Sequence, residues 1–270
     1  MSPPHRRVDT AGLAFRLTES PRPVGSHVPT HVLVHGIGMS HRSLSRLHAE
    51  LAASTRVISV DLPGFAGLPK PSEDLDVVQM GRALADVVAT LDEGRVVLVG
   101  HSMGAQWAVE AALHRPESIT TVVAVGPVAD GRRRTLAAQA RGLAVDTMGE
   151  TPLVNAIVFV DYVRSGMPWY SRQLRHMLAY PMERRARALT VPLLVVRGGE
   201  DPVAGREWCR RLRDAARVAR LVEIPGHRHV ALFSAPRAVA AAILFHTATA
   251  WPDATRMHAA TEGEGASSIL

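Results

Sequence analysis

Val96-Val-Leu-Val-Gly-His-Ser-Met-Gly104 is the stretch of sequence that decides the fold. Its first four residues are apolar and mostly β-branched, which predicts a buried strand, and the residues that follow predict a helix over 103–114. A strand that passes directly into a helix needs a sharp turn, and glycines two positions before and after Ser102 relieve the crowding in such a turn. The Ser102 hydroxyl would then lie at the carboxyl end of the strand, beside the free N–H groups that begin the helix.

Most of the chain repeats this alternation of strand and helix. Two short strands around an Ala11-Gly12 turn are expected first. Further strands are expected at 32–34, 57–60, 96–99, 121–125, 193–196 and 221–224, and helices near 43–53, 74–92, 103–114, 204–217 and 236–248. Nearly continuous apolar strands separated by amphipathic helices predict an α/β fold with a mostly parallel, doubly wound sheet that is covered on both faces.

The alternation is interrupted once, from Ala129 to Leu189, where 61 residues contain no strand-like run. We expect this segment to be a helical cap inserted into a core that comprises residues 1–128 and 190–251. Residues 252–270 are small and polar, and we expect a disordered tail there.

Composition excludes several classes of protein. With 47% hydrophobic and 21% charged residues, the 270-residue chain can bury a large core. The only cysteine, Cys209, excludes an intramolecular disulfide and a cysteine-rich zinc site. The longest apolar run, 238–245, is too short to span a membrane, and the N-terminal residues lack the apolar stretch of a secretory signal. We therefore expect a cytoplasmic protein with no membrane partner.

The basic charge is confined to the expected cap. The chain has a formal charge of +6, and residues 129–189 hold ten arginines against five acidic residues, which leaves only +1 for the rest. This distribution argues against a nucleic-acid partner. We hypothesise that an arginine of this segment binds a carboxylate or phosphate of the substrate, and a solvated helix face is the alternative. The candidates are Arg132, Arg133, Arg134, Arg164, Arg172, Arg175, Arg184, Arg185 and Arg187.

Three other strand ends carry groups that could assist Ser102. His35-Gly-Ile-Gly38 follows the strand at 32–34, and its glycines would let backbone N–H groups face Ser102. We predict that the amides of Ile37 and Met103 stabilise an oxyanion, although an ordinary turn is the alternative. The neighbouring imidazoles of His35 and His101 are expected to make structural hydrogen bonds.

An acid and a base follow later in the chain. Asp201, in Gly198-Gly-Glu-Asp-Pro202, could hold an imidazole in one tautomer, or it could cap a helix that begins near Val203. Pro225-Gly-His-Arg-His-Val230 offers two candidate bases, His227 and His229. Serine, aspartate and histidine at successive strand ends occur in the order that a hydrolase sheet requires.

From about Arg7 to Ala250 these motifs, together with Asp61-Leu-Pro-Gly64, resemble the α/β-hydrolase superfamily, in its serine-nucleophile branch with a small helical cap. The family's last motif usually reads Pro-Gly-x-Gly-His, which aligns its imidazole with His229. Arg228 stands where the family often has glycine. On this resemblance His229 is preferred to His227, and the Asp61 motif is a structural turn.

The resemblance implies that Ser102 attacks a carbonyl carbon, that His229 transfers the proton and that Asp201 orients His229. We expect an esterase that acts on a carboxylic ester of a small or medium hydrophobic acid through an acyl-enzyme. A carbon–carbon bond hydrolase of aromatic catabolism, a cofactor-free perhydrolase and a non-catalytic small-molecule receptor are the alternatives. No metal or organic cofactor is expected, and the expected partner is a small-molecule substrate.

Aromatic and methionine side chains of the expected cap could line an apolar substrate pocket, although packing of the cap onto the sheet is the alternative. The pocket candidates are Phe159, Tyr162, Met167, Trp169 and Tyr170, and Met177, Tyr180 and Met182 share their character.

Overall fold

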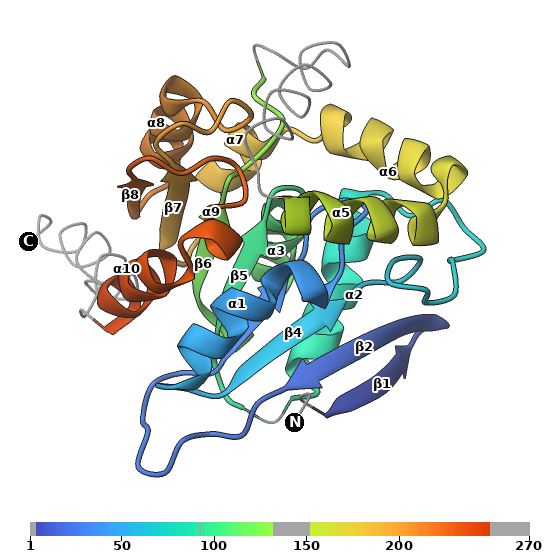
Figure 1. The fold of residues 1–270 in the computed structure, drawn as a ribbon, viewed down its shortest axis with the longest axis horizontal. Coiled ribbons are helices and arrows are strands. Elements are labelled where there is room, and N and C mark those ends of the chain that lie inside the picture. Colours follow the sequence, from blue (N-terminus) through green and yellow to red (C-terminus); the bar gives the residue numbers. More distant parts are fainter. Residues whose placement is uncertain (1–3, 92, 132–151, 249–270) are drawn as a thin grey trace, which may run out of the picture.

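The computed structural model describes residues 4–91, 93–131 and 152–248. An eight-stranded sheet with the order β1-β2-β4-β3-β5-β6-β7-β8 runs through it (Figure 1). The strands are β1 (His5–Thr10), β2 (Leu13–Glu19), β3 (His31–Val34), β4 (Val57–Asp61), β5 (Val96–His101), β6 (Ile119–Val125), β7 (Leu193–Gly198) and β8 (Ala219–Ile224). Strand β2 pairs antiparallel with β1 and β4, and every other pairing is parallel. The predicted mostly parallel sheet is therefore confirmed.

Helices cover both faces of the sheet. One face packs against α1 (His41–Ala52), α9 (Ala231–Ser234) and α10 (Pro236–Ala248), and the other packs against α2 (Val77–Ala89), α3 (Gly104–His114) and α8 (Arg206–Ala215). The sequence of β5 is apolar throughout because both of its faces are buried. Val97 and Val99 pack with α1, α9 and α10, whereas Val96 and Leu98 pack with α2, α3 and α8. Among the described helices, none combines the length and apolar character needed to cross a membrane.

The predicted strands and long helices occur within a few residues of their expected bounds. The Ala11-Gly12 turn joins β1 to β2, and both residues have positive φ, 48° and 76°, as a two-residue hairpin turn requires. Two short elements escaped prediction, the four-residue helix α9 and the 3-10 helix η1 (Pro116–Ser118). Both are far shorter than the window of about 11–18 residues over which an amphipathic pattern can be recognised.

Between β6 and β7 the chain forms α5 (Pro152–Ser165), α6 (Met167–Ala179) and α7 (Met182–Arg187), which we call the helical insert. No strand occurs in its described residues. The division into core and cap stays a prediction. Residues 132–151, with Arg132, Arg133 and Arg134, and the expected tail at 252–270 lie outside the described residues.

Buried polar contacts attach the helical insert to the core. The Gln106 side chain of α3 donates to the Met177 carbonyl at 3.1 Å. Glu110, also on α3 and only 2% exposed, accepts hydrogen bonds from Arg185 at 2.5 and 2.6 Å and from the Tyr180 hydroxyl at 2.7 Å. Because the side chains of Gln106, Glu110 and Tyr180 are buried, breaking these contacts would cost the free energy of their hydrogen bonds.

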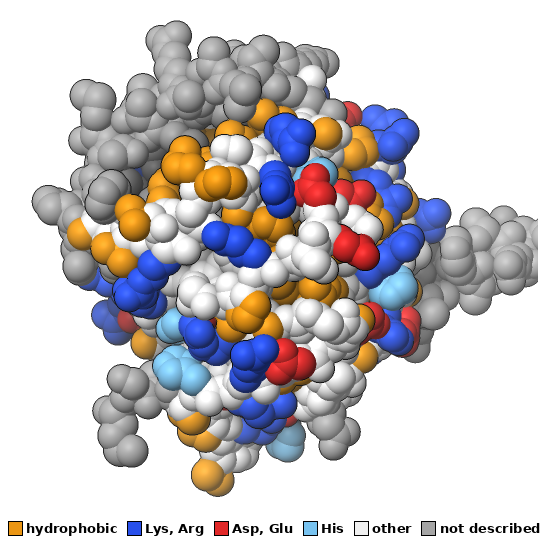
Figure 2. All heavy atoms as spheres, turned by 90° about the vertical axis from the view of Figure 1, so that its right-hand side faces the viewer, with side chains coloured by type: hydrophobic (Ala, Val, Ile, Leu, Met, Phe, Trp, Pro, Cys, Tyr) orange, Lys and Arg blue, Asp and Glu red, His pale blue; other side chains and the backbone are white. Residues whose placement is uncertain are grey.

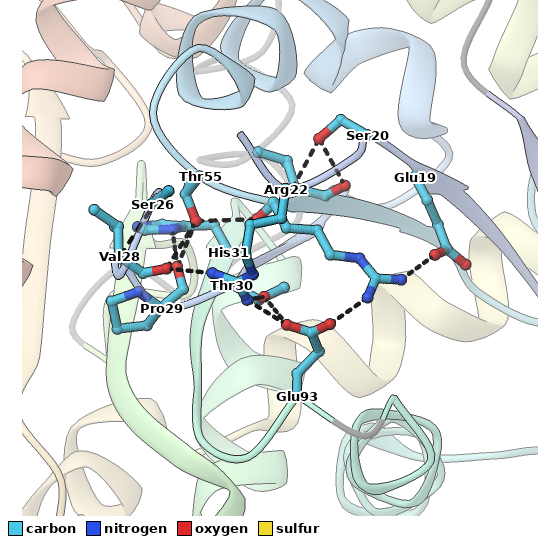
Figure 3. A network of polar contacts seen from close by, with 12 residues as sticks. Glu19, Ser20, Arg22, Ser26, Val28, Pro29, Thr30, His31, Thr55 and Glu93 are labelled. Carbon is cyan, nitrogen blue, oxygen red and sulfur yellow. Dashed lines mark hydrogen bonds and ion pairs between the residues drawn. The ribbon is translucent and has the colours of Figure 1, made fainter. Parts of the chain in front are cut away.

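A second polar network ties together the amino ends of the central strands (Figure 3). The Glu93 carboxylate accepts a hydrogen bond from the Thr30 hydroxyl just before β3 and forms ion pairs with Arg22 and Arg56. Arg56, just before β4, also pairs with Glu19 at the end of β2, at 2.5 Å. This network stabilises the sheet edge opposite to the carboxyl ends of the parallel strands.

Candidate active site

Ser102 lies in a sharp turn between β5 and α3, as its motif predicted. Its φ of +55° is unusual for a residue with a side chain. A Cβ atom on Gly100 would lie 2.2 Å from the Gly104 carbonyl oxygen, and one on Gly104 would lie 2.5 Å from the His35 carbonyl oxygen. Both glycines are therefore required by close backbone contacts, which hold the turn against the end of β3.

Three strand ends bring the side chains of Ser102, Asp201 and His229 together. The Ser102 Oγ is 3.2 Å from His229 Nε2, and His229 Nδ1 is 2.9 Å from Asp201 Oδ2. All three residues are buried, with exposed fractions of 7%, 4% and 4% in sequence order. Asp201 accepts from Nδ1–H, so Nε2 carries the lone pair that faces the serine hydroxyl.

Asp201 is held by a second pair of hydrogen bonds. Its Oδ1 accepts from the backbone amides of Val203 and Ala204, both at 2.8 Å. Burial pushes the pKa of Asp201 upward, but attraction to His229, the hydrogen bond from His229 and the two amides together hold that pKa below its ordinary value. The carboxylate therefore stays charged beside the imidazole. The same carboxylate thus caps the turn at 202–204, whereas α8 itself begins only at Arg206, with Gly205 as its N-cap.

The structure distinguishes the two candidate bases. His227 Nδ1 shares a hydrogen bond with the Ser234 hydroxyl of α9 at 3.0 Å. Within the described part of the chain, His227 makes no hydrogen bond to Ser102 or Asp201, whereas His229 makes one to each. The Arg228 carbonyl lies where a Cβ of Gly198 would be, 2.2 Å away, so the loops after β7 and β8 pack directly on each other.

Two backbone amides lie next to Ser102 without an acceptor. The loop after β3 passes so close to the turn that a Cβ on Gly36 would lie 3.1 Å from the Ser102 Cβ. Ile37 follows Gly36, and Met103 follows Ser102. In the ranges that the structure describes, no hydrogen-bond acceptor contacts either amide. Their role as donors to an oxyanion at Ser102 stays a prediction.

The other strand-end histidines are engaged in hydrogen bonds. His35 donates from Nδ1 to the Gly36 carbonyl at 2.7 Å and accepts at Nε2 from the Leu62 amide at 3.2 Å. His101 donates from Nε2 to the His229 carbonyl at 3.2 Å. Burial lowers the pKa of His101 to about 3, so it is neutral at neutral pH and supports the loop that carries His229.

Two of the pocket candidates, Tyr162 and Tyr170, pack against Gly38 in the loop that follows β3. The rings of Tyr162 and Tyr170 pack against each other with centroids 5.0 Å apart. A Cβ on Gly38 would lie 2.4 Å from the Tyr162 ring and 3.1 Å from the Tyr170 ring. Because Gly38 is one residue beyond Ile37, both tyrosines are well placed to contact a substrate, and their pocket role stays a prediction.

The other pocket candidates behave differently. Trp169 is only 2% exposed and packs on Phe65, with ring centroids 5.9 Å apart, so it joins the core. Met167, the first residue of α6, is 68% exposed, and its assignment to a pocket stays a prediction. The Phe159 side chain lies outside the described residues. The remaining side chains, Met177, Tyr180 and Met182, are buried in the core, in agreement with the alternative that the insert packs onto the sheet.

Two residues that were not predicted from the sequence, Asp161 and Gly126, make contacts that position the site. Asp161 of α5, 1% exposed, accepts a hydrogen bond from the Ser40 hydroxyl at 2.6 Å and forms an ion pair with Arg42. Gly126, at the end of β6, has a φ of +56°, and a Cβ there would lie 3.1 Å from the His229 ring. The one acidic residue of the α5 sequence and a glycine directly after a strand were the available signals.

In the described part of the chain, no arginine of the insert forms a hydrogen bond or ion pair with Ser102, Asp201 or His229. Arg175 pairs with Asp74 at 3.7 Å and Arg187 with Glu183 at 3.3 Å, while Arg185 is bound to Glu110. Arg164 and Arg172 are exposed. The described residues therefore show no contact that supports an anion-binding arginine at the site, and that hypothesis stays a prediction.

Residues 32–242 match the alpha/beta hydrolase family, and the chain belongs to that family. An uncharacterized protein of Mycobacterium tuberculosis is 32% identical over 125 residues, which cover 45% of this chain but only 37% of that relative. An enol-lactonase from Burkholderia xenovorans superposes with a TM-score of 0.76 at 21% identity, covering 91% of this chain and 100% of the other. An esterase from Thermogutta terrifontis superposes with a TM-score of 0.73 at 20% identity, covering 88% and 96%. These likenesses show the alpha/beta hydrolase fold.

Proposed function

We propose that this chain is a serine esterase that cleaves a carboxylic ester of a small or medium hydrophobic acid. The observation that carries the proposal is the buried chain of hydrogen bonds from Ser102 through His229 to Asp201, with distances of 3.2 and 2.9 Å. A serine hydroxyl becomes a good nucleophile when a neighbouring imidazole can accept its proton.

In the first half of the reaction, Ser102 Oγ attacks the carbonyl carbon of the ester while its proton moves to His229 Nε2. The negative charge that develops on the carbonyl oxygen is stabilised by the amides of Ile37 and Met103, and each such donor is typically worth about 10²–10³ in rate. Collapse of this intermediate breaks the bond to the alcohol, which takes the proton from His229 and leaves an acyl-enzyme.

In the second half, water attacks the acyl carbon and gives a proton to His229. The Ser102 ester bond breaks, Ser102 takes that proton, and the acid is released. Asp201 is ionised throughout, because its low pKa keeps it charged beside the imidazolium that forms in both halves. Tyr162 and Tyr170 would contact the substrate next to the oxyanion site.

The test is intact-mass measurement after exposure to a fluorophosphonate, which labels only an activated serine. We expect a single adduct on the wild type and on His227→Ala, and none on Ser102→Ala or His229→Ala. Labelling of Ser102→Ala, or a wild type that is folded but unlabelled, would refute the proposal. Labelling of His229→Ala but not of His227→Ala would make His227 the base.

Kinetics with an ester panel then tests the substrate class. Ser102→Ala should lower kcat by about 10³–10⁶ and Asp201→Asn by about 10⁴, since the triad acts as a unit. Turnover of a vinylogous diketone, with no turnover of simple esters, would indicate the carbon–carbon bond hydrolase instead. An activated serine with no turnover of either class would favour the receptor.

A further inference from the structure

Helix α5 carries apolar residues on the side that faces away from the core. Its inner side holds Asp161 and Ser165, which are 1% and 0% exposed. On its outer side Val160 is 38% exposed and Val163 is 64% exposed, and Met167 at the start of α6 is 68% exposed. The spacing of three residues places Val160 and Val163 on one side of α5, and Met167 begins α6 just beyond Gly166, where the chain turns. We call Val160, Val163 and Met167 the outer stripe.

Basic side chains border the outer stripe. Lys70, Arg164 and Arg172 are all exposed, and in the described ranges none of them forms an ion pair within 4 Å. The Lys70 ammonium lies 3.2 Å from the position of a Cβ on Gly166, directly beside Met167. Figure 2, which views the molecule from the right-hand side of Figure 1, shows hydrophobic, basic and acidic side chains interspersed on this face.

Acidic side chains also lie near this border, and one of them, Asp74, is paired with an arginine. Asp74 is bound by His176 at 3.0 Å and by Arg175 at 3.7 Å, and Asp76 caps α2 through the Gln79 amide. Glu73 is the exposed acidic side chain that remains beside them. Four basic side chains, Lys70, Arg164, Arg172 and Arg175, against the three carboxylates leave this border with a net charge of +1.

We propose that the outer stripe is a docking surface for an anionic lipid membrane. A helix that presents apolar side chains between basic ones binds at the interface of a bilayer, where lipid tails receive the apolar groups and anionic head groups attract the cations. A second copy of the chain fits less well, because a two-fold contact through the stripe would bring like cations together. Docking of this kind is peripheral, and it revises the expectation that the protein has no membrane partner.

This surface is separate from the proposed catalytic groups. Asp161 and Tyr162 on the inner side of α5 reach Ser40 and Gly38, whereas the outer stripe points the opposite way. Docking can therefore be tested without catalysis. The Ser102→Ala variant of the full chain serves for this purpose, so that failure of the proposed esterase activity cannot be mistaken for failure of docking.

The experiment is sedimentation with large vesicles of phosphatidylcholine alone or with 30% phosphatidylglycerol, at about 0.1 M salt. We expect binding only to the anionic vesicles and its loss at 0.5 M salt, since screening weakens attraction between exposed charges. Arg164→Gln should weaken binding about fivefold, because each basic side chain near an anionic bilayer contributes about that factor. Val163→Gln should weaken it as well.

Phe245→Gln is the matched control, because Phe245 is 62% exposed but lies on α10. It should bind like the parent, and thermal unfolding checks that every variant is folded. Three results would overturn the proposal. These are the absence of binding to anionic vesicles, equal binding to neutral vesicles, or equal weakening by Phe245→Gln and Val163→Gln. A dimer in solution that Val163→Gln dissociates would instead assign the stripe to a second copy.

Discussion

Replacing Asp161 by asparagine tests how the helical insert is fixed to the site. The Asp161 carboxylate is buried and binds both the Ser40 hydroxyl and the Arg42 guanidinium. Ser40 is the N-cap of α1, and it lies two residues beyond Gly38, on which Tyr162 packs. The substitution keeps the size of the side chain but removes its charge and presents an N–H group to donors that need an acceptor.

The size of the effect follows from the exposure of the partners. Removing one member of a buried ion pair typically destabilises a protein by about 3–5 kcal/mol. Arg42 is 36% exposed, so water can rehydrate its guanidinium, and we expect a loss of about 2 kcal/mol. If that whole loss appears as a displaced insert, KM rises by at most about thirtyfold. Because Asp161 does not touch Ser102, His229 or Asp201, kcat should stay nearly unchanged.

Steady-state kinetics on a short-chain ester and urea unfolding measure both quantities. Asp74→Asn is the control, because it removes another attachment of the insert, to His176 and Arg175, at the surface. We expect it to change stability by less than about 1 kcal/mol and KM by less than about twofold. A KM for Asp161→Asn equal to that of the control, or a fall in kcat at constant KM, would refute the argument.

Two further predictions concern pH and packing. Burial lowers the pKa of His31 to about 4, whereas an unfolded histidine titrates near 6.5. Between these two pH values the unfolded state binds more protons, so the free energy of unfolding decreases as the pH is lowered. His31→Asn should remove about 2 kcal/mol from the difference in unfolding free energy between pH 7.5 and pH 5, and an unchanged difference would contradict this cause. A Cβ on Gly126 would press on the His229 ring, so Gly126→Ala should lower kcat about 10- to 100-fold, and a folded variant with wild-type kcat would show that the ring tolerates it.

Much of the core was predictable because its signals are local. A run such as Val96–Val99 identifies a buried strand by its own composition, and the glycines on either side of Ser102 identify the turn that follows. Parallel strands share one carboxyl edge, so the positions of Asp201 and His229 after their strands predicted that they would lie near Ser102. The distances of 3.2 and 2.9 Å agree with that expectation.

The insert was less predictable because its contacts are distant in sequence and depend on helix orientation. Asp161 lies 121 positions from Ser40, and no local pattern pairs them. Trp169 and Met167 are two residues apart in one helix, yet one is buried and the other is 68% exposed. A sequence gives the spacing of such side chains but not the side of the helix that meets the core.

The difference between core and insert has a physical origin that bears on function. Ser102, His229 and Asp201 are fixed by strands whose backbone hydrogen bonds leave little freedom, so their geometry depends on the sheet as a whole. The insert is attached instead through individual side chains, with Asp161 at one end and Glu110 at the other. Substitutions there can move Tyr162 or alter the outer stripe without disturbing the hydrogen bonds at Ser102. The positions of the proposed catalytic groups are therefore readable from strand-end motifs, whereas the substrate has to be found by experiments directed at the insert.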